Sequence, residues 1–184
     1  MNLIIENMYR RKSVRRFTEK QLSDEEIITI VEAGIQAPSG HNAQSAYYTI
    51  VQDRDLIEKM NQMAKAEMQK SEVDWIKKFG ASERYHLLHN APTVIIVSAK
   101  DDAYSPVEDS SAAIQNMLLA ATSLGIGSVW IGLIKFFLHL DEAREMLNIK
   151  EGYTPLFAVC FGYENIEVAG SKPIKKTDVY EWIR

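Results

Sequence analysis

Along the chain, segments with hydrophobic residues at helical spacing alternate with short, continuous apolar runs. A capping box formed by Ser23 and Glu26, in which each side chain binds the other's free backbone N–H, predicts the start of a helix. Pro38 predicts its end, because the residue before a proline is pushed out of the helical region. The other predicted helices are residues 2–9, 53–70, 72–90, 107–124 and 141–147, of which 72–90 is weakly patterned.

Four segments predict strands. Residues 46–52 are rich in aromatic and β-branched side chains, which favour strands. Residues 93–97, Thr-Val-Ile-Ile-Val, form a continuous apolar run that is typical of a strand buried on both faces. Residues 128–133 and 155–163 complete the set. Strands alternate with helices, so the class is α+β or α/β, and the lack of linkers and repeats predicts a single domain over residues 1–184.

The composition is that of an ordinary globular chain, with 184 residues, of which 46% are hydrophobic and 25% charged. A single cysteine excludes an internal disulfide and fits a reducing cytoplasm, which is the expected location. No apolar run reaches the roughly 18 residues of a membrane span, and we recognise no signal peptide. The net charge of −4 argues against a general nucleic-acid binder.

One segment departs from this acidic balance, because Arg10–Arg16 carries five basic residues around Ser13 and Val14. It contributes +5 to a net charge of −4 and leaves −9 for the rest of the chain. Such a density of charge is self-repelling unless an anion compensates it. Guanidinium groups beside a hydroxyl suit a phosphate monoester, although a solvated basic helix end is the simpler alternative. A second cationic cluster, Ser171–Lys176, is either a surface tail or the other side of a phosphate site.

Other motifs indicate structural roles. Gly125-Ile126-Gly127 follows a helix and opens a strand, which is the reverse of a dinucleotide-binding turn, so it predicts a tight turn. His86 and His89 have no carboxylates at spacings that would complete a metal site, and no metal is expected. Cys160 lies in an apolar strand, where a thiol is unreactive. Since no residues suggest direct catalysis, the chemistry falls to a cofactor, and a pocket for one phosphate favours a mononucleotide.

The turn Ala37–Asn42 follows the second predicted helix. Ser39 is not expected to be a nucleophile, because its surroundings do not match a nucleophile elbow. A Pro-Ser-Gly turn can instead place backbone N–H groups and the Asn42 amide against the flat polar edge of a ligand.

Three segments, in matching order and spacing, resemble the nitroreductase family of FMN flavoproteins: Arg11–Phe17, Ala37–Gln44 and Leu118–Gly132. The strand Pro155–Tyr163 and the Lys172-Pro173 tail also fit, so the resemblance covers essentially the whole chain. It implies an α+β fold with a central, mainly antiparallel sheet flanked by helices, in an intertwined homodimer with two flavins at its interface. It also implies an oxidoreductase that passes hydride from NADH or NADPH, through flavin N5, to a nitroaromatic, quinone or similar electrophile by a ping-pong mechanism.

The resemblance assigns the FMN phosphate to the two basic clusters. Arg11 and Ser13 would bind it together with one lysine of the tail, while Arg15 would lie nearer the pyrimidine end of the flavin. Because Arg11, Ser13 and Arg15 alternate along the segment and could face one ligand, Lys12 is left to solvent or to a salt bridge, although it is also a candidate ligand. The candidate cofactor-binding residues of this group are Arg11, Lys12, Ser13, Arg15, Lys172 and Lys175.

A second group of candidates is assigned to the flavin ring. The residues that would reach it from the partner subunit are Pro38, Ser39, Gly40 and Asn42. The backbone that would face the flavin near N5 belongs to Ile131, Gly132 and Leu133. The chain departs from the family pattern at Ser45 and Ala46, where the family usually has a proline and an aromatic residue, and at the tail, where lysines replace paired arginines.

Two alternatives remain open. The same flavin and fold would also support reductive dehalogenation, flavin fragmentation or ring dehydrogenation, and the region from about Lys65 to His89, which is expected to cover the pocket, is unassigned. Alternatively, Arg10–Arg16 would bind an acidic partner or nucleic acid without any flavin, which the acidic remainder of the chain disfavours.

Overall fold

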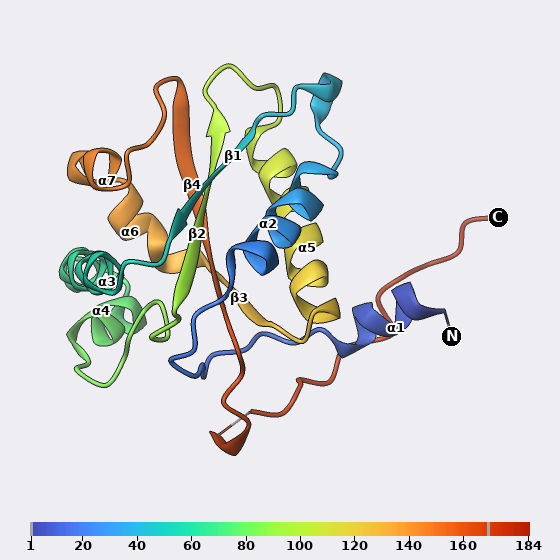
Figure 1. Ribbon diagram of the computed structural model, residues 1–184, viewed down its shortest axis with the longest axis horizontal. Helices are drawn as coiled ribbons and strands as arrows, with labels where there is room; N and C mark the ends of the chain where they lie inside the picture. The colour runs from blue at the N-terminus through green and yellow to red at the C-terminus, as the bar shows by residue number, and fades with distance from the viewer. Residues whose placement is uncertain (1, 169) are drawn as a thin grey trace.

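The computed structural model describes residues 2–168 and 170–184, and its centre is a four-stranded antiparallel sheet (Figure 1). The strands are β1 (Ala46–Val51), β2 (Thr93–Lys100), β3 (Gly127–Ile131) and β4 (Tyr153–Gly162), in the order β1-β2-β4-β3. All neighbouring pairs are antiparallel, which confirms the α+β class and the antiparallel sheet. The third strand ends two residues earlier than predicted, because Gly132–Ile134 turn into a short 3₁₀ helix.

Helices cover both faces of this sheet. Figure 1 shows α2 and α5 on one face and α3, α4, α6 and α7 on the other, while α1 lies at the end of the molecule near the C-terminal tail. The helices are α1 (Leu3–Arg10), α2 (Asp24–Ile35), α3 (Arg54–Gln69), α4 (Asp74–Ala81), α5 (Pro106–Ser123), α6 (Lys135–Leu138) and α7 (Asp141–Met146). Short 3₁₀ turns also lie at Gly40–Asn42 and Ile166–Val168. Among the described residues, no helix has the length and apolar character needed to cross a membrane.

The predicted start and stop signals are confirmed in the helix ends. Ser23 Oγ accepts the Glu26 N–H at 3.3 Å, and the Ser23 N–H donates to the Glu26 carboxylate at 2.8 Å, so both halves of the capping box are present. Asp53 caps α3 by accepting backbone N–H groups. Gly125 takes φ +74° just after α5, which is a conformation that glycine adopts without strain.

The core consists of two apolar layers separated by the sheet. In β2, Ile95 and Val97 pack with residues of α2 and α5, while Val94 and Ile96 pack with residues of α3 and α6. These four side chains are fully buried, which confirms the predicted strand with two covered faces. Burying each contributes about 1.5–3 kcal/mol relative to exposure, so this layer arrangement is a major source of stability.

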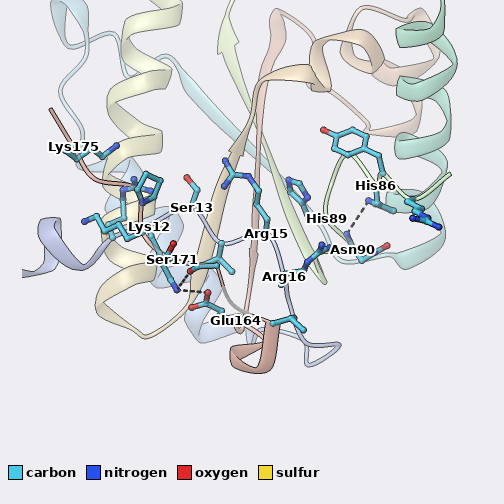
Figure 2. Close-up of a pocket in the computed structure, with 18 residues that line it drawn as sticks. Lys12, Ser13, Arg15, Arg16, His86, His89, Asn90, Glu164, Ser171 and Lys175 are labelled. Atoms are coloured by element: carbon cyan, nitrogen blue, oxygen red, sulfur yellow. Dashed lines mark hydrogen bonds and ion pairs between the residues drawn. The ribbon is translucent and has the colours of Figure 1, made fainter. Parts of the chain in front are cut away.

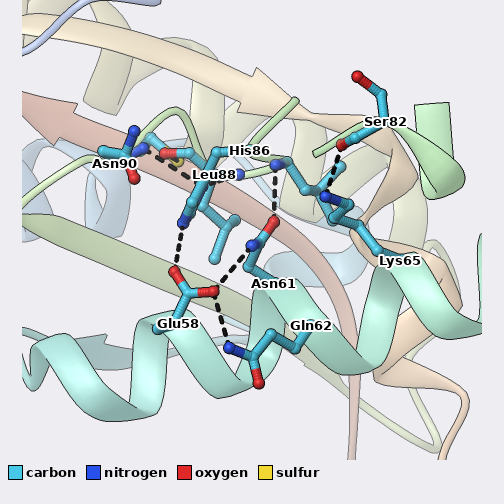
Figure 3. Close-up of polar contacts among 10 residues, drawn as sticks. Glu58, Asn61, Gln62, Lys65, Ser82, His86, Leu88 and Asn90 are labelled. Atoms are coloured by element: carbon cyan, nitrogen blue, oxygen red, sulfur yellow. Dashed lines mark hydrogen bonds and ion pairs between the residues drawn. The ribbon is translucent and has the colours of Figure 1, made fainter. Parts of the chain in front are cut away.

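The segment 72–90 differs from the predicted helix. Helix α4 ends at Ala81, and the chain then runs through turns, with His89 and Asn90 in the left-handed region at φ 54° and 52°. Side chains of α3 hold these turns, as Figure 3 shows: Asn61 Oδ1 accepts the Leu87 N–H at 2.9 Å. The prediction was wrong beyond residue 81 because hydrogen bonds to side chains of the preceding helix, α3, replace the bonds that would continue α4.

Candidate functional site

The basic segment is held by main-chain hydrogen bonds at one end of the sheet. The Val14 N–H donates to Ser128 O of β3 at 3.0 Å, and the Asn165 N–H donates to Arg16 O at 2.9 Å. The segment therefore runs extended between β3 and the chain that follows β4. Because these bonds use backbone atoms, they fix the path of the segment and leave its charged side chains free to face a ligand.

Gly127, the first residue of β3, allows the basic segment to pack closely on this strand. Val14 is only 5% exposed, and a Cβ on Gly127 would lie 2.9 Å from the Val14 Cβ, closer than atoms of this kind approach. Gly127 is thus required for the close contact between β3 and the basic segment. The Gly125-Ile126-Gly127 motif is a packing platform for the site, in agreement with the predicted tight turn.

A cavity of about 700 Å³ lies beside this segment, within the usual size of a cofactor site. We call it the basic cleft, and Figure 2 shows its lining. The structure brings the first group of candidates together here, since its lining includes Arg11, Lys12, Ser13, Arg15, Lys172 and Lys175. Two clusters that are more than 150 positions apart in the chain thus converge on one space, where their charges act on the same ligand.

Lys12 is engaged by the protein itself. Its Nζ lies 2.8 Å from Glu164 Oε1 and donates to Gly170 O at 3.3 Å (Figure 2). This confirms the expected salt bridge and ties the tail to the basic segment. Lys172 also donates to a backbone oxygen, that of Tyr9. Arg11 forms no ion pair with any of the described residues, so its charge is available to a ligand.

The opposite wall of the cleft comes from the turns after α4. It includes Arg84, Tyr85, His86, His89 and Asn90. None of these was assigned to a ligand from the sequence, although the region was expected to cover the pocket. The sequence feature that could have pointed to them is the many polar and aromatic residues after residue 81, which lack helical periodicity. Such a pattern indicates an irregular surface segment, and these often carry function.

His86 anchors this wall through hydrogen bonds on both ring nitrogens. Its Nε2 lies 3.1 Å from Glu58 Oε2, and its Nδ1 accepts the Leu88 N–H at 3.1 Å (Figure 3). An Nδ1 that accepts must be unprotonated, so the ring is neutral. Burial lowers the pKa of His86 below its usual value, despite the opposing effect of Glu58. No group of three or more potential ligands is placed to hold a metal within residues 2–168 and 170–184.

His89 is neutral for a related reason. Burial, with a smaller contribution from Arg15, lowers the pKa of His89 to about 4. The positive charge of the basic cleft therefore comes from arginine and lysine at neutral pH. Cys160, beneath this wall, is fully buried, and burial raises the pKa of its thiol.

Of the second group of candidates, the residues of the turn before β1 lie at the other end of the sheet. The turn of residues 38–45, which we call the 38–45 turn, precedes β1 (Figure 1). Ser45 O accepts the N–H of Lys100, which pairs with Tyr153, whereas Ser128 pairs with Phe161. The two places are eight residues apart along β4, or about 27 Å at roughly 3.4 Å per residue. One chain does not bring the turn and the basic cleft together.

The 38–45 turn also differs from the expected array of free backbone donors. The Gly40 N–H donates to Asp109 Oδ1 at 2.8 Å, and the Gln44 N–H donates to Ser39 Oγ at 2.9 Å. These two groups are satisfied within the chain, and of the four candidate residues of the turn Pro38 and Asn42 are the exposed ones. The third candidate stretch, Ile131–Leu133, ends β3 outside the lining of the basic cleft.

Comparison with known proteins places this geometry in context. A family model described as the nitroreductase family matches residues 8–163. An Archaeoglobus fulgidus protein, provisionally named an NADH dehydrogenase/NAD(P)H nitroreductase, is 34% identical over 91% of this chain and 88% of its own length. The NADPH-flavin oxidoreductase of Vibrio harveyi is 31% identical over 94% and 71%.

Solved structures agree with these relatives. A Bacteroides fragilis nitroreductase with bound FMN superposes with a TM-score of 0.92 at 30% identity, covering 100% of both chains. An iodotyrosine deiodinase bound to FMN and 3-iodo-L-tyrosine has a TM-score of 0.79 at 21% identity, over 99% of this chain and 100% of its own, a likeness of fold alone.

Proposed function

The chain belongs to the nitroreductase family of FMN-dependent NAD(P)H oxidoreductases, and from this premise we propose that its basic cleft binds the FMN phosphate. The enzyme would pass reducing equivalents from NADH or NADPH to a nitroaromatic, a quinone or a similar small electrophile. The observation that carries the proposal is the convergence of Arg11 and Ser13 with the lysines of the tail around one cavity. This donor set fits a phosphate monoester, because planar guanidinium and hydroxyl donors match its oxygens.

The contacts within the cleft indicate different roles for its cations. Lys12 holds Glu164 and the tail, and Lys172 holds the end of α1, so these two lysines shape the cleft. Lys175 lines the same cavity, and we assign it to the phosphate with Arg11 and Ser13. Arg15 stands at the centre of the cleft in Figure 2, where its charge would stabilise the negative charge of the reduced flavin ring.

The 38–45 turn would complete the site of the partner subunit in a homodimer. It is about 27 Å from the basic cleft of its own chain, which is too far for one mononucleotide to contact both. Its exposed Pro38 and Asn42 would reach the flavin across the interface, as the resemblance implies. The backbone of Gly132 is also exposed, with open space where a side chain would stand, and would face the reacting edge of the ring.

Bound FMN supplies the two-electron chemistry in two half-reactions. The residues of the chain bind and orient, and none is assigned as a general acid or base. Donor and acceptor would occupy the same space in turn, which predicts parallel lines in double-reciprocal plots.

The test is the absorbance spectrum of the purified full-length protein with FMN, recorded anaerobically before and after NADH or NADPH. We expect a flavin spectrum that is bleached by one or both donors and restored by a nitrofuran or a quinone. Protein that stays colourless after FMN is added would overturn the proposal. A reduced flavin that neither acceptor reoxidises would instead favour another reaction on the same cofactor, such as reductive dehalogenation.

A further inference from the structure

A buried carboxylate joins the two ends of the 38–45 turn. Asp109 lies in the first turn of α5 and is 6% exposed. Its Oδ1 accepts the Gly40 N–H at 2.8 Å, and its Oδ2 accepts the Ser45 hydroxyl at 2.7 Å. One side chain from a distant helix therefore fixes both the entry and the exit of the turn.

The turn needs such an anchor, because its backbone is strained. His41, Asn42 and Gln44 all have positive φ, at 53°, 55° and 46°, and none is glycine. Residues other than glycine keep this conformation only where the surrounding structure holds it. All three side chains are exposed, and of the three only His41 packs against another ring, with its centroid 5.3 Å from that of Tyr104. The hydrogen bonds to Asp109 are the buried part of what holds the turn.

We infer that Asp109 is a positioning residue for the FMN site, which holds the 38–45 turn in the shape that contacts the flavin of the partner subunit. This inference rests on the proposed function. A turn that is fixed before the cofactor arrives loses little conformational entropy on binding, so the tie raises FMN affinity without any contact to FMN.

Ser45 gives the tie a feature particular to this chain. It stands where the family usually has a proline, and a proline limits the backbone by its ring. Here a hydroxyl limits the backbone by a hydrogen bond to a carboxylate. The same position therefore restricts the turn by a different device, and that device depends on Asp109.

The first experiment compares two serines. Ser45 and Ser110 are both fully buried, but the Ser110 hydroxyl has no hydrogen-bond partner in the structure. We expect Ser45→Ala to raise the FMN Kd of the flavin-stripped protein about tenfold, as for the loss of one charge-assisted hydrogen bond. Ser110→Ala makes the same chemical change nearby and should leave Kd within about twofold. Equal values for the two variants would overturn the inference.

The second experiment asks whether Asp109 acts through the turn. Asp109→Ala should speed amide hydrogen exchange at Gly40 and Gln44 in the flavin-free protein and weaken FMN binding at least as much as Ser45→Ala. Asp109→Asn should restore both, because its carbonyl accepts the Gly40 N–H and its amide donates to the Ser45 hydroxyl. If the turn loosens while FMN Kd is unchanged, the inference fails and the proposed function stands.

The two ideas fail differently. Wild-type protein that binds no FMN would overturn the proposed function, and the inference with it. Should Asp109→Ala fail to fold, Ser45→Ala against Ser110→Ala still decides the matter, since both of these variants keep the buried carboxylate. Sedimentation of each variant confirms that any change in FMN Kd is measured on the same oligomer as the wild-type protein.

Discussion

The basic cleft and the 38–45 turn lie at opposite ends of the sheet and are built on opposite plans. In the cleft, Arg11 and its neighbours gather positive charge that is largely unmatched by the chain itself. In the turn, Asp109 and Ser39 satisfy the backbone donors and hold a strained path. The positive charge of the cleft therefore stays uncompensated until an anionic ligand binds, whereas the shape of the turn is already fixed by hydrogen bonds within the chain. The proposed site would thus combine an attracting half, the cleft, with a preformed half, the turn.

The largest effect is expected from the attracting half. Arg11→Ala should raise the FMN Kd by roughly 30- to 150-fold, because a hydrogen bond to a charged group contributes about 2–3 kcal/mol. Fluorescence titration of the flavin-free protein measures this value. The matched control is Arg10→Ala, since Arg10 is exposed and is not part of the cleft lining. Equal losses for both would mean that only the overall charge of the segment matters.

A mixed dimer sharpens the comparison by testing which cleft each turn serves. When an Arg11→Ala chain pairs with an Asp109→Ala chain, a turn that acts across the interface leaves one site fully intact and damages the other twice. We expect one tightly bound FMN per dimer, measured on doubly tagged, co-purified protein. If each turn served its own chain, both sites would be damaged and no tight FMN would remain.

A smaller effect is expected from pH on the stability of the protein, and it arises in the wall of the cleft, at His89, and not in the turn. The pKa of His89 is lowered to about 4 in the folded protein, against roughly 6.5 when unfolded. The unfolded chain therefore binds more protons in this window, so stability falls as the pH drops from about 6.5 towards 4. Below about pH 4 both states are protonated and no further stability is lost through His89.

The variant His89→Asn tests this sign, because asparagine tolerates the left-handed backbone at this position. Its Tm should fall less than that of the wild-type protein between about pH 7.5 and pH 5. The difference should be roughly 2–4 °C, for about 1 kcal/mol after allowance for partial exposure. His139→Asn, at an exposed site, should follow the wild-type curve. If the Tm of His89→Asn falls with pH as much as that of the wild-type protein, His89 does not cause this loss of stability.

The smallest effect is expected at Lys12, inside the cleft itself. Since its ammonium is paired with Glu164, Lys12→Ala should raise the FMN Kd by less than about fivefold, as for a partly exposed ion pair of roughly 1 kcal/mol or less. The double variant Lys12→Ala/Glu164→Gln should bind FMN no worse than Lys12→Ala. A loss as large as that of Arg11→Ala would show that Lys12 binds the phosphate directly.

Much of the fold follows from local patterns. The capping box of Ser23 and Glu26, the apolar run of β2 and the turn at Gly125 each act within a few residues, so the sequence reveals them directly. The phosphate-binding candidates were predictable for a similar reason, because charge density is visible in one segment. The resemblance to a family supplied the rest of the candidate list.

The missing parts depend on partners far apart in the chain. Asp109 binds Gly40 and Ser45, which lie 69 and 64 positions away in the chain, and no local pattern in the sequence predicts these hydrogen bonds. The turns after α4 are held by Asn61 and by His86 in a network that local propensity does not contain. Sequence reasoning found the residues that carry charge and missed those that hold the backbone still.

The main-chain attachment of the basic segment has a consequence for how this site can change over time. Its path is set by the main-chain hydrogen bonds of Val14 to Ser128 and of Asn165 to Arg16 and by the packing of Val14 on Gly127, and the one ion pair of the segment, Lys12 with Glu164, is partly exposed. The cationic positions can therefore be exchanged one at a time without unfolding the scaffold, so ligand preference can drift through small steps. Gly127, which does not line the cleft, tolerates no such exchange because a Cβ there would collide with Val14, and a survey of mutational tolerance would rank it among the most constrained positions around the basic cleft.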